Sequence, residues 1–220
     1  MKSDARNTMK APKPGLMVII SSPSGGGKSS ICRRLLSPSR RRLGWKFSIS
    51  FTTRPRRKGE RNGREYHFVT QDKFATLASQ GMFAEHFHVH LYDYGTPRGP
   101  IEQLRQKGGV MLFDVDVQGA ARLHGEYPDA LTIFILPPST AELRRRLRRR
   151  GTETKEQLKL RYENARKEMR AVMQDRTYPF EYVVINDDLN EAVADVLAVI
   201  RSGLLRYGRL PMEQITKMLG

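Results

Sequence analysis

The chain has 220 residues, of which 39% are apolar and 28% are charged, and its formal net charge is +16. No apolar run approaches the roughly 20 residues that a membrane-spanning helix needs, so these proportions favour a globular protein with one sizeable core. The positive charge favours anionic partners, of which nucleotide phosphates, nucleic acid and a membrane surface are the candidates. Cys32 is the only cysteine, which excludes an intrachain disulfide and is compatible with the cytoplasm.

Residues 1–15 are mainly polar and lack the apolar stretch of a secretory signal, so they predict a disordered N-terminal arm. After them, short apolar runs occur at wide intervals, at residues 16–20, 110–115, 131–136 and 182–185. They are nearly continuous rather than alternating, which is typical of strands buried on both faces of a parallel sheet.

Helical patterns separate these runs. One follows the first run at residues 28–36, a second at 101–107 lies between Pro100 and Gly108, and a long third one lies near the C-terminus. Strands that alternate with helices predict an α/β fold of three layers.

The most specific motif joins the first strand to the first helix. It is the sequence Ser22-Pro23-Ser24-Gly25-Gly26-Gly27-Lys28-Ser29, followed by Ser30. A strand, a glycine-rich turn and a helix that begins with Lys-Ser are the context of a phosphate-binding loop, or P-loop. Its glycines let backbone N–H groups point inward, and the helix N-terminus adds partial positive charge. We expect Lys28 to reach the β- and γ-phosphates of a nucleoside triphosphate and the Ser29 hydroxyl to bind Mg²⁺.

Residues 47–91 alternate between apolar and polar and contain turns rich in Gly, Pro and Arg, which predicts a small, mostly antiparallel insert that extends to residue 96. A strand expected over residues 47–52 has its hydroxyl side chains on one face, and these are Ser48, Ser50 and Thr52. The strand leads into a cluster of arginines, whose guanidinium groups suit phosphate oxygens: Arg54, Arg56 and Arg57. Tyr66 adds a hydroxyl nearby, and the alternative is a solvated basic loop beside an ordinary core tyrosine.

Glu85 lies in an apolar row of a strand expected over residues 83–91, together with Phe83, Phe87, Val89 and Leu91. A carboxylate in such a row is costly unless it is paired or binds a ligand. Guanine offers two adjacent donors, N1–H and the 2-amino group, whereas adenine presents an acceptor at N1. Glu85 therefore indicates guanine recognition, the alternative being a glutamate in water at a strand end.

The opposite face of that strand carries His86, His88 and His90. We favour a polar face turned to solvent over a metal site, because no further ligand is placed to complete one. Tyr94-Gly95-Thr96 then ends the insert with two hydroxyl groups.

Asp114 and Asp116 follow the second apolar run. In an open α/β sheet, ligands bind beyond the carboxyl ends of the strands. One or both of these acids can hold Mg²⁺ through water or accept donors from a base, and the alternative is that they cap the next helix.

Residues 139–176 predict two charged helices joined by Gly151-Thr152-Glu153-Thr154, each beginning with a capping-box pattern. A glycine-containing joint between such helices favours a mobile lid. Leu143 and Leu147 leave the first helix one buried stripe, so several arginines are expected in water: Arg144, Arg145, Arg148 and Arg149. Others are expected to neutralise the transferring phosphoryl group, and these are Arg146, Arg150 and Arg161.

Taken in this order, the motifs resemble the guanylate kinase family over about residues 16–200. The resemblance implies an enzyme that transfers the γ-phosphoryl group of ATP, bound with Mg²⁺, to GMP or dGMP. It implies a P-loop core formed by residues 16–46, 97–138 and 177–207, with a GMP-binding insert at 47–96 and a lid with its following helix at 139–176. The tail at 208–220 has no expected role.

The resemblance also implies roles for individual residues. Guanine contacts fall on Ser50, Glu85, Thr96 and Asp116, and GMP phosphate contacts fall on Arg54, Arg57, Tyr66 and Tyr94. The groups around the transferring phosphate are Lys28, Arg146, Arg150 and Arg161. ATP binding falls on residues 22–30 and Asn186, and Mg²⁺ binding on Ser29 and Asp114.

Two departures from the family pattern stand out. Ser22 replaces a glycine, and Pro55 comes one place early in the arginine stretch, so Arg56 is an alternative to Arg57.

Three rival functions were weighed. A scaffold domain without catalysis would lose the P-loop lysine or the lid arginines, which this chain keeps. A nucleic-acid binder would interleave basic residues with stacking aromatics, so only weak, non-specific binding is expected here. Another nucleoside monophosphate kinase would differ at Glu85. No membrane partner is expected.

Overall fold

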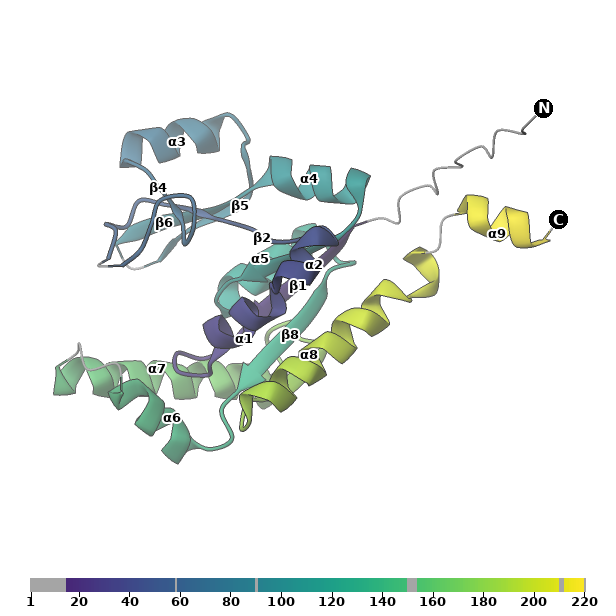
Figure 1. Cartoon of the computed structure of the whole chain (residues 1–220). Coiled ribbons are helices and arrows are strands. Elements are labelled where there is room, and N and C mark those ends of the chain that lie inside the picture. The colour runs from purple at the N-terminus through teal and green to yellow at the C-terminus, as the bar shows by residue number, and fades with distance from the viewer. Residues whose placement is uncertain (1–14, 58, 90, 150–153, 210–211, 220) are drawn as a thin grey trace, which may run out of the picture.

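The computed structural model describes residues 15–57, 59–89, 91–149, 154–209 and 212–219, and Figure 1 shows how their elements are arranged. A parallel sheet in the order β2-β7-β1-β8-β9 forms the centre. Its strands are β1 (Leu16–Ser21), β2 (Trp45–Phe47), β7 (Val110–Asp114), β8 (Leu131–Leu136) and β9 (Tyr182–Ile185). All but β2 coincide with the apolar runs, and the predicted α/β fold with a parallel sheet is confirmed.

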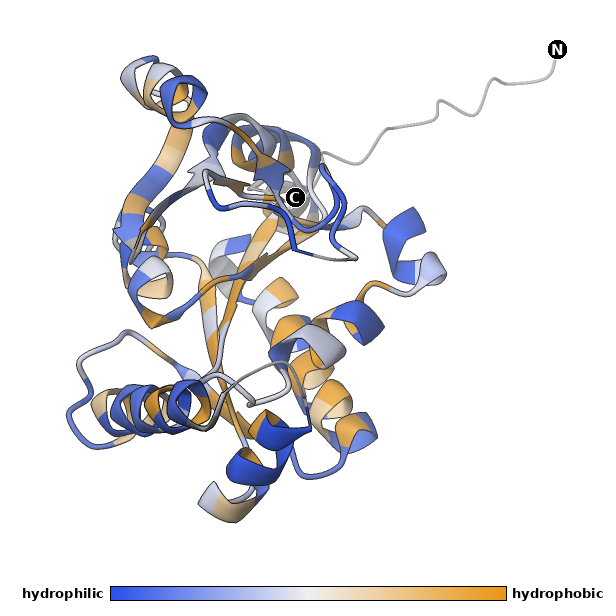
Figure 2. Ribbon diagram, turned by 90° about the vertical axis from the view of Figure 1, so that its left-hand side faces the viewer, coloured by the Kyte–Doolittle hydropathy of each residue, from blue (hydrophilic) through white to orange (hydrophobic). Residues whose placement is uncertain are grey.

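Alternate residues of β1 are buried against two layers of helices. Leu16, Val18 and Ile20 belong to the core shared with α1 (Lys28–Leu35) and α8 (Leu189–Leu204). Met17 and Ile19 belong to the core shared with α4 (Arg98–Lys107) and α5 (Val117–Glu126). Figure 2 shows the hydrophobic residues concentrated on the strands and on the helix faces turned toward them. Because both faces of the sheet are covered, its strands lack polar alternation.

The helix expected at residues 101–107 is longer than its pattern indicated. It begins at Arg98, so Pro100 lies within its first turn, where backbone N–H groups need no partner inside the helix. It ends as expected before Gly108, whose φ of 79° suits a glycine.

A second sheet, here called the insert sheet, has the order β4-β3-β6-β5. It consists of β3 (Phe51–Thr52), β4 (His67–Phe68), β5 (Phe83–Val89) and β6 (Tyr92–Pro97), with α3 (Gln71–Ser79) between β4 and β5. β6 pairs antiparallel with both neighbours, whereas β3 and β4 are parallel. The sequence did not predict α3, because Phe74 is its one buried residue and the apolar periodicity is correspondingly weak.

The prediction of a single strand over residues 47–52 is wrong. β2 ends at Phe47 and pairs with β7 in the central sheet, whereas β3 begins at Phe51 in the insert sheet. The chain crosses from one sheet to the other between them, so Ser48, Ser50 and Thr52 do not share one strand face. The apolar row expected over residues 83–91 is also shorter than predicted, because β5 ends at Val89 and does not include Leu91. Within β5, the pairing with β6 shifts in register between Phe83 and Glu85.

The helices α6 (Thr140–Arg148) and α7 (Lys155–Met173) pack together through Leu143, Leu147 and Ala165. Thr154 and Gln157 form the expected capping box of α7. Ser139 caps α6 by accepting from the Glu142 N–H at 3.1 Å, but the Glu142 side chain binds arginines instead of closing the box. In Figure 1 these two helices and the insert sheet lie on opposite sides of the α1 N-terminus.

The other helical elements are α2 (Pro38–Arg42), a 3₁₀ turn η1 (Tyr207–Arg209) and α9 (Met212–Leu219). α9 lies in the tail for which the sequence predicted no structure. The expected N-terminal arm lies outside the described residues, apart from Gly15. Among the described helices, none combines the length and the apolar character needed to cross a bilayer.

Two helical glycines give a matched test of close packing. A Cβ at Gly203 of α8 would overlap the side chain of Leu131 and lie 3.3 Å from Leu16, both fully buried, whereas a Cβ at Gly125 of α5 would meet nothing within 4 Å. We therefore expect Gly203→Ala to lower the free energy of unfolding by about 1–3 kcal/mol. Gly125→Ala should raise it by about 0.5–1 kcal/mol through reduced chain entropy and better helix propensity. Urea denaturation measures both, and equal effects would contradict the packing argument.

Candidate nucleotide-binding site

The P-loop connects β1 to α1 at the carboxyl edge of the central sheet. Gly25 and Gly27 have φ of 91° and 96°, a region that residues with a Cβ rarely adopt. Gly27 is the N-cap of α1, and no side chain caps that helix. Its first N–H groups are therefore available to an anion, as in other P-loops.

Lys28 connects this loop to the end of β7. Its ammonium group lies 2.8 Å from Asp114 Oδ1 and donates a hydrogen bond to the Val115 carbonyl. Ser29 and Ser30 follow it with exposed side chains. A lysine held over the mouth of a P-loop can exchange its partner for a phosphate oxygen.

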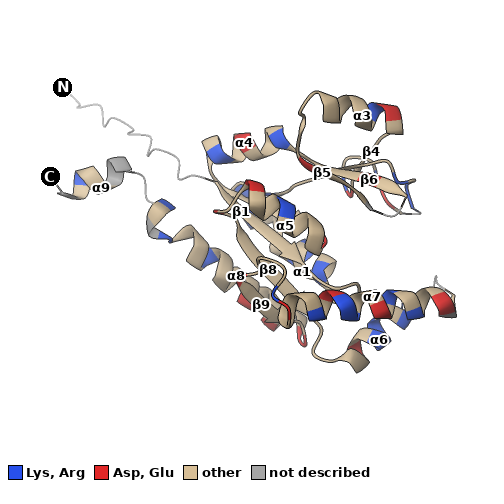
Figure 3. Cartoon of the chain, turned by 180° about the vertical axis from the view of Figure 1, so that it is seen from behind, with Lys and Arg blue, Asp and Glu red and all other residues tan. Residues whose placement is uncertain are grey.

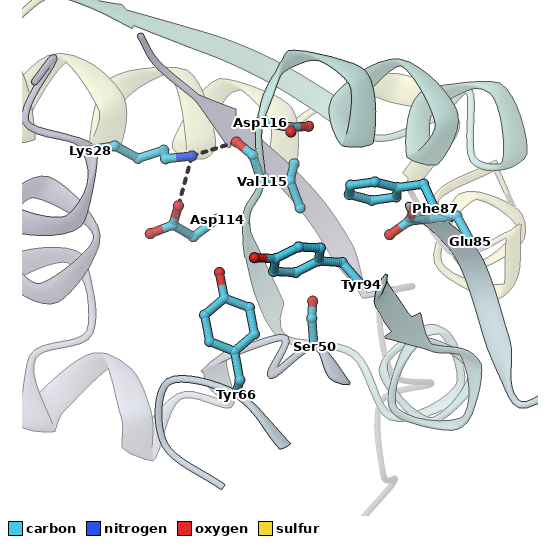
Figure 4. Close-up of a pocket in the computed structure, with 9 residues that line it drawn as sticks. All are labelled: Lys28, Ser50, Tyr66, Glu85, Phe87, Tyr94, Asp114, Val115 and Asp116. Atoms are coloured by element: carbon cyan, nitrogen blue, oxygen red, sulfur yellow. Dashed lines mark hydrogen bonds and ion pairs between the residues drawn. The ribbon is translucent and has the colours of Figure 1, made fainter. Parts of the chain in front are cut away.

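A cavity of about 270 Å³ opens between the carboxyl edge of the central sheet and the insert sheet (Figure 4). It is lined by Lys28, Ser50, Tyr66, Glu85, Phe87, Tyr94, Asp114, Val115 and Asp116. The structure thus brings seven of the predicted site residues around one space, although they come from six separate places in the sequence. Phe87 and Val115 also line it and had no predicted role.

Glu85 is the buried acid of this cavity, with an exposed fraction of 9%. Its Oε1 accepts a hydrogen bond from the Thr96 hydroxyl at 2.6 Å, and Oε2 is buried without a partner among the described residues. The pKa of Glu85 is raised to about 7, mainly by burial and in part by the charge of Asp116, while the Thr96 hydrogen bond and the charge of Arg122 lower it. A buried acceptor without a partner is the feature expected of a group that awaits a ligand's donor.

The remaining predicted guanine contacts surround this carboxyl group. Ser50 Oγ lies 3.4 Å from Thr96 Oγ1, so these two hydroxyls and Glu85 form one chain. Asp116 is the N-cap of α5 and accepts from the Gly119 N–H at 2.8 Å. It lines the cavity as well, so the capping and ligand-binding interpretations are compatible.

Arg54 lies beneath the tyrosines of the cavity. Its guanidinium group forms a two-pronged ion pair with Glu60, at 2.8 and 3.1 Å, and lies 5.5 Å from the centroid of the Tyr66 ring. The Tyr66 hydroxyl is a neutral donor at physiological pH, and burial raises its pKa further from neutrality, to about 12. Glu60 also accepts from the backbone N–H of Arg57, whose side chain is exposed and does not line the cavity. Arg56 is exposed too.

Groups from three distant segments meet at the P-loop. Asn186, after β9, donates through Nδ2 to the Gly26 carbonyl at 2.8 Å, and its backbone carbonyl accepts from Arg146 at 2.8 Å. Arg146 also contacts the Gly26 carbonyl at 3.5 Å. Arg161 of α7 donates to Ser24 Oγ at 2.6 Å. Both arginines therefore lie where a triphosphate would bind, and Figure 3 shows Lys and Arg distributed along α6 and α7. Arg150 lies outside the described residues.

Other arginines of α6 have different surroundings. Arg144, Arg145, Arg148 and Arg149 are exposed. Arg145 shares Glu142 with Arg146, and the Arg144 guanidinium lies 4.2 Å from the centroid of the Tyr162 ring. Glu142 thus orients Arg146, a role that its i,i+4 spacing could have suggested.

The donor set near Lys28 fits Mg²⁺. Ser29 and Asp114 supply a hydroxyl and a carboxylate, the oxygen ligands that this ion prefers. No group of three or more His, Cys, Asp or Glu side chains in the described structure could hold a metal. Of the three histidines of β5 and its end, His88 pairs with Asp93 at 2.8 Å, and His90 lies outside the described residues.

Sequence reasoning also passed over Glu168. This α7 residue is half-buried, and burial followed by the negative charge of Asp116 raises its pKa to about 7, while Lys28 opposes the shift. No motif signals it, because its surroundings arise only when α7 packs beside the central sheet.

Glu85 should make stability depend on pH. Between its ordinary pKa of 4.5 and about 7, the folded state keeps a proton that the unfolded state has lost, so the free energy of unfolding falls as pH rises. Glu85→Gln has no ionisable group at this position, so this decrease in the free energy of unfolding is absent from the variant. We expect its melting temperature to exceed that of the wild type by roughly 3–8 °C at pH 8 and by much less at pH 5. Calorimetry measures this, with exposed Glu102→Gln as control. An equal difference at both pH values would contradict the assignment.

Comparison with known proteins agrees with this geometry. A family model described as guanylate kinase matches residues 15–203. The guanylate kinase of Syntrophotalea carbinolica is 43% identical over 201 residues, covering 90% of this chain and 91% of that protein. The guanylate kinase of Chelativorans sp. is 46% identical over 198 residues, covering 90% of this chain and 87% of that protein.

A solved structure is similar as well. The guanylate kinase from Anaplasma phagocytophilum aligns with a TM-score of 0.71 and 31% identity over 90% of each chain. Since the family model and the relatives span nearly the whole described fold, the chain belongs to the guanylate kinase family.

Proposed function

We propose that this chain transfers the γ-phosphoryl group of ATP to GMP by Mg²⁺-assisted in-line displacement, giving ADP and GDP. The observation that supports this best is that Lys28 of the P-loop and buried Glu85 line one cavity. A nucleoside monophosphate with its base at Glu85 can direct its phosphate toward the P-loop. Bringing two nucleotides together in this way supplies the positioning on which phosphoryl transfer depends.

We assign the cavity to GMP. Oε2 of Glu85 accepts one of the two adjacent guanine donors and Oε1 the other, with Asp116, Ser50 and Thr96 completing the polar surroundings of the base. The GMP phosphate lies toward Tyr66 and Tyr94, within reach of Arg54 and Arg57. The support is the unpartnered buried oxygen of Glu85 and the neutral hydroxyl of Tyr66.

We assign the P-loop, residues 22–30, and Asn186 to ATP. Lys28, Arg146 and Arg161 neutralise charge on the phosphoryl group in transfer, together with Arg150. Mg²⁺, held by Ser29 and Asp114 with the phosphates, supplies further charge neutralisation and orients the chain of phosphates. The support is the convergence of the two described arginines on Gly26 and Ser24.

We further propose that the insert (residues 47–96) and the lid (residues 139–176) close over the core segments and their nucleotides. Exclusion of water directs the γ-phosphoryl group to GMP instead of to hydrolysis. The placement of both segments on opposite sides of the α1 N-terminus supports such closure (Figure 1). The reaction supplies GDP, and dGDP from dGMP, for triphosphate synthesis in the cytoplasm.

The first test measures ADP formation from ATP and Mg²⁺ with GMP, AMP, CMP or UMP offered separately. We expect turnover with GMP alone. Lys28→Met should lower kcat by at least about a hundredfold, because it removes a group that stabilises the transferring phosphate. Exposed Lys107→Met is the control and should keep full activity. Absence of turnover with every acceptor would favour a binding module, and a fully active Lys28→Met would disprove the P-loop assignment.

Glu85→Gln tests base recognition. The amide replaces one acceptor by a donor, so it faces the guanine donors with a mismatch. We expect kcat/KM for GMP to fall by about a hundredfold or more, with KM for ATP changing by less than about twofold. Steady-state kinetics with each substrate varied in turn measure this, and exposed Glu102→Gln is the control. Full preference for GMP over AMP in the variant would refute the proposed role.

A further inference from the structure

Arg122 of α5 lies against Phe87, which forms with Tyr94 an aromatic wall of the cavity beside Glu85. Its guanidinium carbon is 4.9 Å from the centroid of the Phe87 ring. That ring lines the cavity and stacks with Tyr94, with the centroids 5.9 Å apart and the planes inclined by 20°. A cation over an aromatic face is attracted by the negative charge of the π system, so Arg122 helps to fix the orientation of Phe87.

A glycine allows this approach. A Cβ at Gly119 would lie 3.4 Å from Phe87 Cε1 and 3.2 Å from Val115 Cβ, so α5 packs directly against the cavity wall. Arg122 lies three residues further along α5, on the same helix face. Phe87 and Glu85 are alternate residues of β5, and Figure 4 shows their side chains next to each other. Phe87 and Glu85 therefore both lie near α5, the helix that carries Arg122.

Three groups of the described structure influence the charge of the Glu85 carboxyl group. Thr96 of β6 donates a hydrogen bond, Asp116 at the start of α5 adds a like charge, and Arg122 supplies the one positive charge among them. Over the described part of the chain, Arg122 itself forms neither a hydrogen bond nor an ion pair. Its charge is therefore not neutralised by a nearer carboxylate.

We infer that Arg122 is a positioning residue of the guanine site, which holds the Phe87 wall in place and favours the carboxylate form of Glu85. This inference rests on the proposed role of Glu85 in binding GMP. A protonated Glu85 would turn an O–H donor toward guanine's own donors and lose one acceptor. Arg122 thus acts through Glu85 and Phe87 and has no contact with the reacting atoms.

The test is equilibrium binding of GMP to the full chain by titration calorimetry at pH 6.5 and 8.5. Arg122→Gln should weaken binding relative to wild type by about threefold to tenfold at pH 6.5 and by clearly less at pH 8.5, where Glu85 is ionised without help. The affinity of each variant is divided by that of the wild type at the same pH, so ionisation of GMP itself cancels. Arg122→Lys keeps the charge and should restore most of the affinity.

Arg105→Gln is the matched control, because its guanidinium lies at the same 4.9 Å from an aromatic ring, that of Tyr127, which does not line the cavity. It should bind GMP like the wild type. Since Arg122 is exposed, its variants should fold, and thermal melts check this. A loss of affinity that is the same at both pH values, or no loss, would overturn the inference.

Glu85→Gln and the double variant separate this inference from the proposed function. If Glu85→Gln binds GMP as well as the wild type at pH 8.5, the proposed recognition of guanine fails. If Glu85→Gln weakens binding but Arg122→Gln has its full effect in the Glu85→Gln variant, only the inference about Arg122 fails and the proposed function stands. We expect the effect of Arg122→Gln to be reduced in the double variant, where only its contact with Phe87 remains to be lost.

Discussion

The parallel register of β1 and β7 determines where the groups of the site lie. Ile20 pairs with Asp114, so the P-loop after β1 and the acids after β7 leave the sheet at the same edge. Lys28 can therefore contact Asp114 across two strands. The pairing of β8 with β9 brings Asn186 to this edge as well, where it binds the Gly26 carbonyl. A shift of register would carry Asp114 away from the P-loop and separate these contacts.

Glu85 shows how the proposed guanine site departs from the rules that stabilise the rest of the fold. Most of the buried polar side chains in the described structure have partners, but Glu85 Oε2 has none, together with Ser21 Oγ and Ser48 Oγ. An internal partner for Oε2 would make the protein more stable and leave no acceptor for a base. The unsatisfied oxygen is therefore consistent with recognition rather than with stability, as is common where local rules fail at functional sites.

Much of the fold and of the candidate site could be predicted from the sequence, because continuous apolar runs and the P-loop pattern are local signals. Glu85 was identified because a carboxylate interrupts an apolar row. The strand at 47–52 was mispredicted, since alternation cannot reveal that the chain changes sheets. Contacts such as Arg122 with Phe87 or Arg161 with Ser24 join segments far apart in the sequence. Those contacts became visible only in three dimensions.

The cations that the structure describes around the P-loop have oxygen partners within the protein: Lys28 with Asp114, Arg146 with Glu142 and Asn186, and Arg161 with Ser24. An incoming polyphosphate would meet open N–H groups at the start of α1, but it would have to replace the present partners of these side chains. Part of its gross attraction would therefore be offset by contacts that break. The same contacts can re-form as a product departs, which limits how tightly a bound nucleotide is held.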